Sequence, residues 1–419
     1  MNDMVAGDRH ANWFRRLSPV QRRSFWAAFG GNSLDNLDFS LFSFLVPTLI
    51  ATWGMTRGEA GLIAASTTIT GALGGVLAGT LADRYGRVAV LQGTILWFSA
   101  FTFLCGFAQS PDQLLALRAL QGLGFGGELA VGAVLIGESV AAHDRGKIMG
   151  GVASGYAIGA IGASALYAAA FLLLPPETAW RAALWLGILP ALLVLYVRKG
   201  VREPEVFAST ERMGMWTSFK TLFTGSLLLR TLLAVVLVAG ITGTQLTLAI
   251  WLPTWLRTER GLTVLNTSTN AIIGYIGSFI GFLIGGYLVD RLGRRNSFRW
   301  FAVITFVSVC FYLFFPMSNA MLRFVGGPVG VVLVVMGVGM TPYLTELFPT
   351  AVRASGLGLC YSLGRALGAL APIVVGVISK DLGVGSAMLW LMSGCLLLVI
   401  ISASLLPREP DEVANSALR

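Results

Sequence analysis

The stretches GTLADRYGR (residues 79–87) and GYLVDRLGR (residues 286–294) are near copies of each other, 207 residues apart. A second pair repeats at almost the same distance. GESVAAHDRG (137–146) is echoed by TELFPTAVRAS (345–355), and in both copies a Glu precedes an Arg by seven positions. Two unrelated motifs that recur at nearly one offset indicate a duplicated unit. Parallel repeats in membrane proteins place a binding site where the two halves meet.

Each repeat holds six apolar stretches that are long enough to cross a bilayer, which takes about 20 residues per helix. The whole chain is 55% hydrophobic and only 12% charged, which is typical of membrane proteins and not of soluble ones. The sequence therefore predicts an all-α membrane protein with 12 spans. These are residues 24–53, 59–82, 87–109, 112–138, 146–173, 179–197, 230–256, 265–289, 298–316, 320–341, 353–379 and 383–406.

The longest polar stretch between spans divides the chain into two six-helix bundles. We expect an N-terminal segment, a first bundle, a linker, a second bundle and a tail: residues 1–23, 24–197, 198–229, 230–406 and 407–419. The apolar run that follows the basic N-terminus is too long for a signal peptide, so it is expected to remain as the first span.

Positive charge is distributed unevenly between the two sides of the predicted membrane. Of the 30 lysines and arginines, 22 fall on the side of the termini and six on the other side. By the positive-inside rule both termini are cytoplasmic. The net charge of +9 is spread over short loops and forms no basic face for nucleic acid. We expect lipid contact and a monomer.

Metal, cofactor and enzyme chemistry have no support in the sequence. The four cysteines lie in apolar runs without paired spacing, and the two histidines lie outside those runs. No nucleophile and base, and no metal-binding set, share one depth in the membrane, so we expect no enzyme and no cofactor. A membrane nutrient sensor stays open as an alternative, although such proteins usually carry a long tail.

The repeated G-x-L-x-D-R-x-G-R motif resembles the signature of the major facilitator superfamily, and RALQGLGFGGE (118–128) resembles its second signature, R-x-x-x-G-x-G. Within that family, D-N-L-D (35–38) is similar to the D-G-x-D of proton-coupled aromatic-acid and sialate symporters. The E-L-F-P-T-x-x-R run also fits organic-acid symporters. Asn36 stands where those families commonly have Gly. The resemblance implies two six-helix bundles and secondary transport.

Four ionisable residues are candidates for proton coupling. Asp38 and Arg118 lie about 21 Å above the inner face and about 9 Å below the outer face, which is nearly the same depth in a core ~30 Å thick. They are expected to pair, as a static ion pair or as a proton switch that the resemblance supports. Asp35, one turn from Asp38, either titrates with it as a coupled pair or bonds a neighbouring helix. Glu128 either relays the proton or holds a structural partner.

Arg365 is the main candidate for substrate binding. It lies near the middle of its span, with no acidic residue close by in that helix, so its guanidinium could clamp a carboxylate. An acid on another span, such as Asp35, is the alternative partner. Other candidates for the substrate site are Gln245, Tyr361, Thr242 and Asn36. Thr242 and Gln245 occupy the places of Asp35 and Asp38 in the second repeat.

The repeated motifs are expected to form a conformational gate at the inner side. Aspartates at helix ends oppose the negative end of the helix dipole, and arginines beside them can compensate. The alternative to a gate role, for the outer arginines of each motif, is that they anchor the helix ends to lipid phosphates. The expected gate residues are Gly79, Asp83, Arg84, Gly86, Arg87, Asp290, Arg291, Gly293, Arg294, Glu138, Arg145, Glu346 and Arg353.

The sequence thus predicts a transporter that imports a small organic anion with protons. A carboxylate, an aromatic acid and a sialic-acid-like molecule are all compatible with it. A proton-coupled sugar or polyol symporter and a drug or metabolite antiporter remain as alternatives. GYAIGAIGA (155–163) lacks the G-P pair typical of antiporters in span five. The expected location is a bacterial inner membrane.

Overall fold

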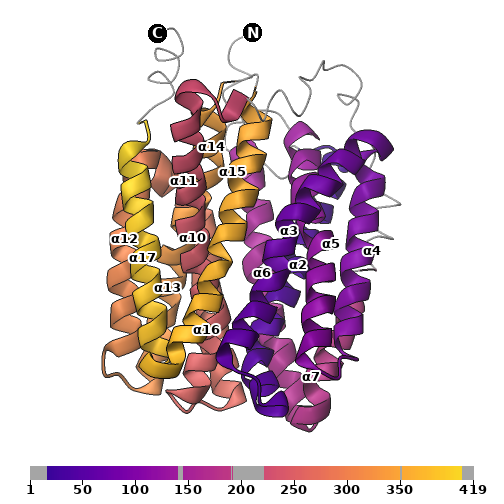
Figure 1. The fold of residues 1–419 in the computed structure, drawn as a ribbon, viewed down its shortest axis with the longest axis vertical. Coiled ribbons are helices and arrows are strands. Elements are labelled where there is room, and N and C mark those ends of the chain that lie inside the picture. Colours follow the sequence, from indigo (N-terminus) through magenta and orange to yellow (C-terminus); the bar gives the residue numbers. More distant parts are fainter. Residues whose placement is uncertain (1–16, 140–144, 190, 192–220, 350–351, 408–419) are drawn as a thin grey trace, which may run out of the picture.

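The structure is a computed structural model that describes residues 17–139, 145–189, 191, 221–349 and 352–407. This part of the chain is almost entirely helical (Figure 1). In the first half the helices are α2 (Pro19–Trp53), α3 (Arg57–Tyr85), α4 (Arg87–Cys105), α5 (Pro111–Ser139), α6 (Arg145–Leu173) and α7 (Pro176–Trp185), followed by the 3₁₀ turn η1 (Leu186–Ile188). In the second half they are α10 (Gly225–Thr258), α11 (Val264–Leu292), α12 (Arg294–Phe314), α13 (Asn319–Val338), α14 (Met340–Leu347), α15 (Arg353–Gly368), α16 (Leu370–Leu382) and α17 (Val384–Leu405).

The duplication seen in the sequence is present in the helix boundaries. Shifting α3 by 207 residues gives the exact bounds of α11, Val264–Leu292. Both helices end at a glycine with positive φ, Gly86 at 91° and Gly293 at 77°. An L side chain rarely adopts that conformation, so these glycines stop the helix and turn the chain. The D-R-x-G-R motif is therefore first of all the turn between two helices.

Helix starts are set by side chains that satisfy the free amides of the first turn. Ser18 and Gln21 form a capping box at the start of α2, and Thr56 and Glu59 form another at the start of α3. A box of this kind pairs two otherwise unbonded backbone donors. It fixes where each span begins.

Two of the expected spans are each divided into two helices. The span expected at 320–341 continues as α13 and α14, which meet at Gly339, and the span expected at 353–379 is divided into α15 and α16. A proline explains each break: Pro342 cannot donate to the carbonyl of Val338, and Pro372 cannot donate to that of Gly368.

The membrane spans are only partly described. In the span expected at 179–197, the structure describes helix only up to Ile188 and at Ala191. Within the described residues ten helical segments are long and apolar enough to cross a membrane.

Helices from the two halves occupy opposite sides of the molecule, with α2–α7 on one side and α10–α17 on the other (Figure 1). Within each half, glycines bring backbones into contact. A Cβ atom at Gly74 of α3 would lie 2.1 Å from the carbonyl oxygen of Leu123 in α5. In the second half, a Cβ atom at Gly277 of α11 would lie 1.9 Å from that of Gly327 in α13. The same helix pair is thus packed through glycine in both repeats.

α2 begins and α17 ends at the same end of the bundle, which we call the inner end after the orientation expected from charge (Figure 1). The halves meet closely at the opposite, outer end. A Cβ atom at Gly61 of α3 would lie 2.7 Å from the carbonyl oxygen of Pro372, and one at Gly376 of α16 would lie 2.3 Å from that of Arg57. Towards the inner end α3 exposes Leu73, Leu77 and Leu81. The described conformation is therefore closed at the outer end.

Candidate functional site

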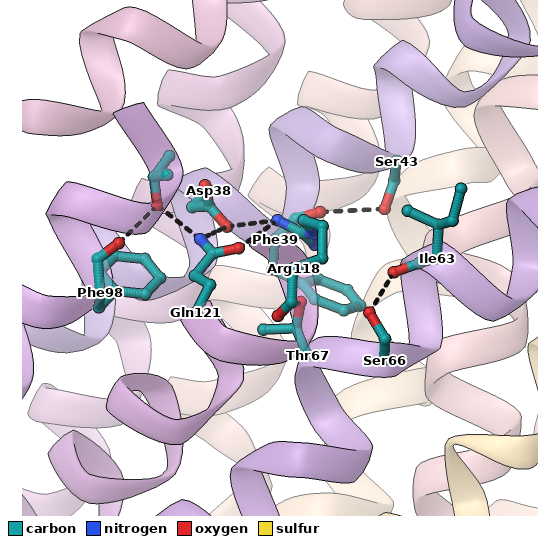
Figure 2. Close-up of polar contacts among 10 residues, drawn as sticks. Asp38, Phe39, Ser43, Ile63, Ser66, Thr67, Phe98, Arg118 and Gln121 are labelled. Atoms are coloured by element: carbon teal, nitrogen blue, oxygen red, sulfur yellow. Dashed lines mark hydrogen bonds and ion pairs between the residues drawn. The ribbon is translucent and has the colours of Figure 1, made fainter. Parts of the chain in front are cut away.

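A buried charge pair lies inside the first half. Arg118 of α5 donates through Nη1 to Oδ2 of Asp38 in α2 at 2.9 Å (Figure 2). Arg118 is 1% exposed and Asp38 is 4% exposed. The pairing expected from their matched depth is present. A charge pair so far from water is held by its own attraction and by further hydrogen bonds.

Gln121 supplies those further bonds. Its Oε1 accepts from Arg118 Nη1 at 2.9 Å, and its Nε2 donates to Oδ2 of Asp38, also at 2.9 Å. The same Nε2 donates to the hydroxyl of Thr102 in α4, which in turn donates to the carbonyl of Phe98 (Figure 2). We call Asp38, Arg118, Gln121 and Thr102 the buried tetrad.

Gln121 and Thr102 were not among the residues predicted from the sequence. A signal for Gln121 was available, because it lies three positions after Arg118 and therefore on the same face of α5. Thr102 comes from another helix, and nothing in its apolar surroundings marks it.

The tetrad leaves some polar atoms unused. Asp38 Oδ1 and the Nε and Nη2 atoms of Arg118 have no hydrogen-bond partner among the described residues. The guanidinium carbon of Arg118 lies 4.0 Å from the centroid of the Phe42 ring instead. The pair thus rests on one carboxylate oxygen, Oδ2, while Oδ1 has no hydrogen-bond donor among the described residues. Protonation would weaken the charge-assisted bonds at Oδ2.

The other two proton-coupling candidates are less well placed. Asp35 is 3% exposed, about one turn of α2 nearer the inner end than Asp38, and Arg118 makes its ion pair with Asp38 and not with it. Glu128 belongs to α5, but its side chain lies outside the described residues.

Arg365 lies half-buried in α15, where the two halves meet. Its guanidinium carbon is 5.5 Å from the ring centroid of Tyr361 in its own helix and 5.5 Å from that of Phe125 in α5. Among the described residues it makes no ion pair. The alternative partner considered for it, Asp35, is therefore not bound to it in this conformation. The cation rests on aromatic faces, which attract it without neutralising it.

Aromatic residues from several helices surround this cation. Tyr156 of α6 lies near Arg365 and Tyr361 of α15 and near Tyr275 of α11. Tyr156 also packs against Phe282 of α11, with 6.1 Å between ring centroids. Residues from both halves thus meet around Arg365, which is where a parallel repeat places its substrate.

The neutral candidates are engaged in helix packing. Asn36 donates to the carbonyl of Tyr156 at 2.6 Å, and its Oδ1 has no partner among the described residues. Gln245 donates to the carbonyl of Leu333 at 3.3 Å. A Cβ atom at Gly368 of α15 would lie 2.8 Å from Cβ of Thr242, so Thr242 packs there against backbone.

One face of α5 connects the tetrad to the cation. Arg118, Gln121 and Phe125 are three and four residues apart, so their side chains follow one stripe of the helix. Arg118 and Gln121 contact Asp38, and Phe125 contacts Arg365.

Gate residues at the inner end form contacts within each half. Arg294 of α12 forms an ion pair with Glu346 of α14. Arg353 donates to the carbonyl of Phe348, and Arg291 donates to the hydroxyl of Tyr287. Arg84 lies over the ring of Tyr85 at 5.3 Å. Asp290 is exposed, and Gly79 adjoins open space.

The remaining gate candidates lie outside what the structure describes. These are the side chains of Asp83, Arg87, Glu138 and Arg145. Within the described residues, no group of three or more His, Cys, Asp and Glu converges as a metal site would require.

Comparison with known proteins gives the family. The model of the Major Facilitator Superfamily matches residues 28–369. A probable 4-methylmuconolactone transporter of Cupriavidus pinatubonensis is 39% identical over 90% of this chain and 88% of its own length. The sialic acid transporter of Escherichia coli is 28% identical over 89% of this chain and 91% of its own.

A solved structure of the E. coli xylose transporter, in an inward-open conformation, has the same fold. It superposes with a TM-score of 0.73 over 94% of this chain and 98% of its own, at 16% identity. These relatives are transporters and not enzymes. By its repeated motifs, its fold and the match of its sequence, the chain belongs to the major facilitator superfamily.

Proposed function

We propose that this chain imports a small organic anion together with protons by alternating access. The anion is a carboxylate, which includes aromatic acids and sialic-acid-like molecules. In this proposal 12 helices form two six-helix bundles, residues 24–197 and 230–406, with both termini in the cytoplasm of a bacterium and the bundles in its inner membrane. The protein acts as a monomer.

Arg365 is the observation that carries the anion part of the proposal. A guanidinium at mid-membrane that has no carboxylate partner among the described residues is costly, because a charge there costs at least ~2.5–3.5 kcal/mol. Contact with aromatic faces offsets about 0.5–2 kcal/mol of that cost. A bound carboxylate would offset more, since the guanidinium can donate two parallel hydrogen bonds to it. The substrate is therefore the missing partner of this cation.

The buried tetrad supports the proton part. In the described conformation two N–H donors, Arg118 Nη1 and Gln121 Nε2, are hydrogen-bonded to Oδ2 of Asp38. A proton on the free Oδ1 oxygen would remove the charge that Arg118 needs. The packing of α2 against α5 would then favour another arrangement, which is what a coupled conformational change requires.

The experiment is uptake into proteoliposomes that contain the purified chain. Labelled benzoate, muconate, sialic acid and xylose are offered under an inward proton gradient. At least one acid is expected to accumulate, and a protonophore abolishes the accumulation. Accumulation of xylose without any acid contradicts the anion assignment, and accumulation that survives the protonophore contradicts proton coupling.

Asp38→Asn tests the proton switch directly. The amide cannot carry the proton, so gradient-driven accumulation is lost, while exchange of labelled for unlabelled acid can continue. Asp112→Asn is the matched control, because Asp112 is an exposed acid in the first turn of α5, away from the tetrad. Concentrative uptake by the Asp38→Asn variant would exclude Asp38 as the coupling group.

A further inference from the structure

Two arginines at the outer end reach across the boundary between the halves. Arg57, at the start of α3, donates to the carbonyl of Ser379 in α16 at 2.9 Å. Arg257, near the end of α10, donates to the hydroxyl of Tyr167 in α6 at 3.0 Å and to that of Thr48 in α2 at 3.4 Å. One arginine thus extends from each half to the other, and both bind neutral oxygen atoms.

Other arginines at this end make the same kind of contact within one half. Arg181 of α7 donates to the carbonyls of Gly106 and Ala108, all in the first half. Arg260 donates to the carbonyl of Met317, both in the second half. These contacts do not cross the boundary, so a movement of one half against the other leaves them intact.

Two acidic residues at the outer end, Glu59 and Glu259, are likewise bound within their own half. Glu59 is hydrogen-bonded to the amide and hydroxyl of Thr56, in the capping box of its own helix. Glu259 accepts hydrogen bonds from the amides of Val384 and Gly385 at the start of α17. Carboxylates in these places are stabilised by free amides and by the helix dipole. They keep those partners when the halves separate.

Separation of the outer ends therefore has an asymmetric electrostatic effect. Alternating access is largely a rigid-body rocking of one bundle against the other. That motion removes the carbonyl from Arg57 and both hydroxyls from Arg257, and it removes no partner from Glu59 or Glu259. The charges that opening uncovers are thus two guanidinium groups on opposite sides of the mouth. Asp381, two residues after Ser379, is already exposed.

We propose that Arg57 and Arg257 form an outer anion site that exists only when the outer end is open. In the closed state their donors are satisfied by the facing half, and on opening they become available to a carboxylate from outside. The same two side chains thus close the outer end and attract the next anion. This site rests on the alternating access proposed above, and it lies apart from Arg365 at mid-membrane.

A charge-selective probe tests this without knowledge of the substrate. Ser379→Cys keeps the carbonyl that Arg57 binds and places a thiol that is fully buried while the outer end is closed. Two membrane-impermeant thiosulfonates are applied from the outside, one bearing a sulfonate and one a quaternary ammonium. The labelling of the parent chain, with its four cysteines, is subtracted. We expect the sulfonate to react roughly tenfold faster, the low end of electrostatic steering.

The arginine variants separate an anion site from a simple lock. Arg57→Gln and Arg257→Gln should each lower the ratio of sulfonate to ammonium rates, and together they should bring it close to one. Arg181→Gln and Arg260→Gln, which keep the boundary contacts, should leave the ratio unchanged.

Three results would overturn the proposal. If the Gln variants speed both reagents equally, Arg57 and Arg257 only hold the outer end closed. If the two control variants lower the ratio as much, the effect is general surface charge. If Ser379→Cys is not labelled in any variant, this boundary does not open. None of these measurements depends on uptake. The outer anion site can therefore be disproved while the proposed transport function holds, and the reverse.

Discussion

The two halves share their helix boundaries but not their polar interiors. A shift of 207 residues carries Asp38, Arg118, Gln121 and Thr102 onto Gln245, Val325, Pro328 and Val309. Every member of the buried tetrad is thus replaced, and no charge remains. Conversely Arg365 corresponds to Ile158, an exposed apolar residue of α6. The duplicated scaffold has kept its packing while each half acquired its own charged centre.

The difference indicates which features belong to the fold and which to the function. Glycine contacts between α3 and α5 recur between α11 and α13, so they serve the scaffold. A charged group that appears in one half only is not required by the scaffold. Because buried charges destabilise a membrane protein, the proposed role in transport would account for their presence in one copy only.

Breaking the ion pair of the first half should have the largest effect. Arg118→Gln leaves Asp38 buried without its cation, and removal of one partner of a buried pair costs about 3–5 kcal/mol. The expected result is a large fall in the thermal unfolding midpoint of the purified protein. Val325→Gln makes the corresponding change in the second half, where no charge is left unpaired, and should be much milder. The double variant Asp38→Asn, Arg118→Gln should recover most of the loss. A double variant no more stable than Arg118→Gln would contradict the coupling of the two residues.

The charged centre of the second half is tested by Arg365→Lys. Lysine keeps the charge but cannot form two parallel hydrogen bonds, and a hydrogen bond to a charged group contributes about 1.5–3 kcal/mol. Binding of the transported acid should weaken roughly tenfold or more, as measured by the dissociation constant from titration calorimetry. Arg353→Lys changes an arginine at the inner end that binds a backbone carbonyl, and should leave the constant unchanged. Equal affinity in wild type and Arg365→Lys would rule out a carboxylate clamp.

Sequence reasoning reached the scaffold because the repeat and the apolar stretches are local patterns. It also reached the Asp38–Arg118 pair, because depth along two straight helices can be counted from residue numbers. It did not predict that spans ten and eleven are each divided into two helices. Pro342 and Pro372 were visible, but the length of the apolar stretches was given more weight than the missing backbone donors.

Side-chain contacts between different helices could not be predicted in this way. Thr102 completes the tetrad from α4, Phe125 meets Arg365 from α5, and Arg57 reaches the carbonyl of Ser379. Each depends on the rotation of one helix relative to another, which no single stretch of sequence determines. The contacts of Phe125 and Arg57 also cross between the halves and change when the halves move, so much of the candidate mechanism lies in them.

A smaller effect is expected from Gln121→Leu, which removes the bridge between Asp38, Arg118 and Thr102. Loss of a buried hydrogen-bond partner costs about 1–3 kcal/mol, and more where the neighbour is charged. Gln245→Leu is the counterpart in the second half, because Gln245 stands in the place of Asp38 and donates only to a neutral carbonyl. Gln121→Leu should lower the thermal midpoint more than Gln245→Leu. The reverse order would mean that the tetrad is not specially dependent on its glutamine.

The smallest effect is expected where the two centres meet. Phe125→Leu keeps apolar volume but removes the ring on which Arg365 rests, and a cation–π contact contributes about 0.5–1 kcal/mol. Acid binding should weaken about two- to fivefold, whereas Phe98→Leu, which changes a ring packed 6.4 Å from Phe125, should not alter it.

Phe125 shares a face of α5 with Arg118 and Gln121, so it can transmit the state of Asp38 to Arg365. If it does, the penalty of Phe125→Leu on acid binding will differ between the wild type and the Asp38→Asn variant. If the two penalties are equal, the charged centres are energetically independent, and coupling between proton and anion must run through the movement of whole halves.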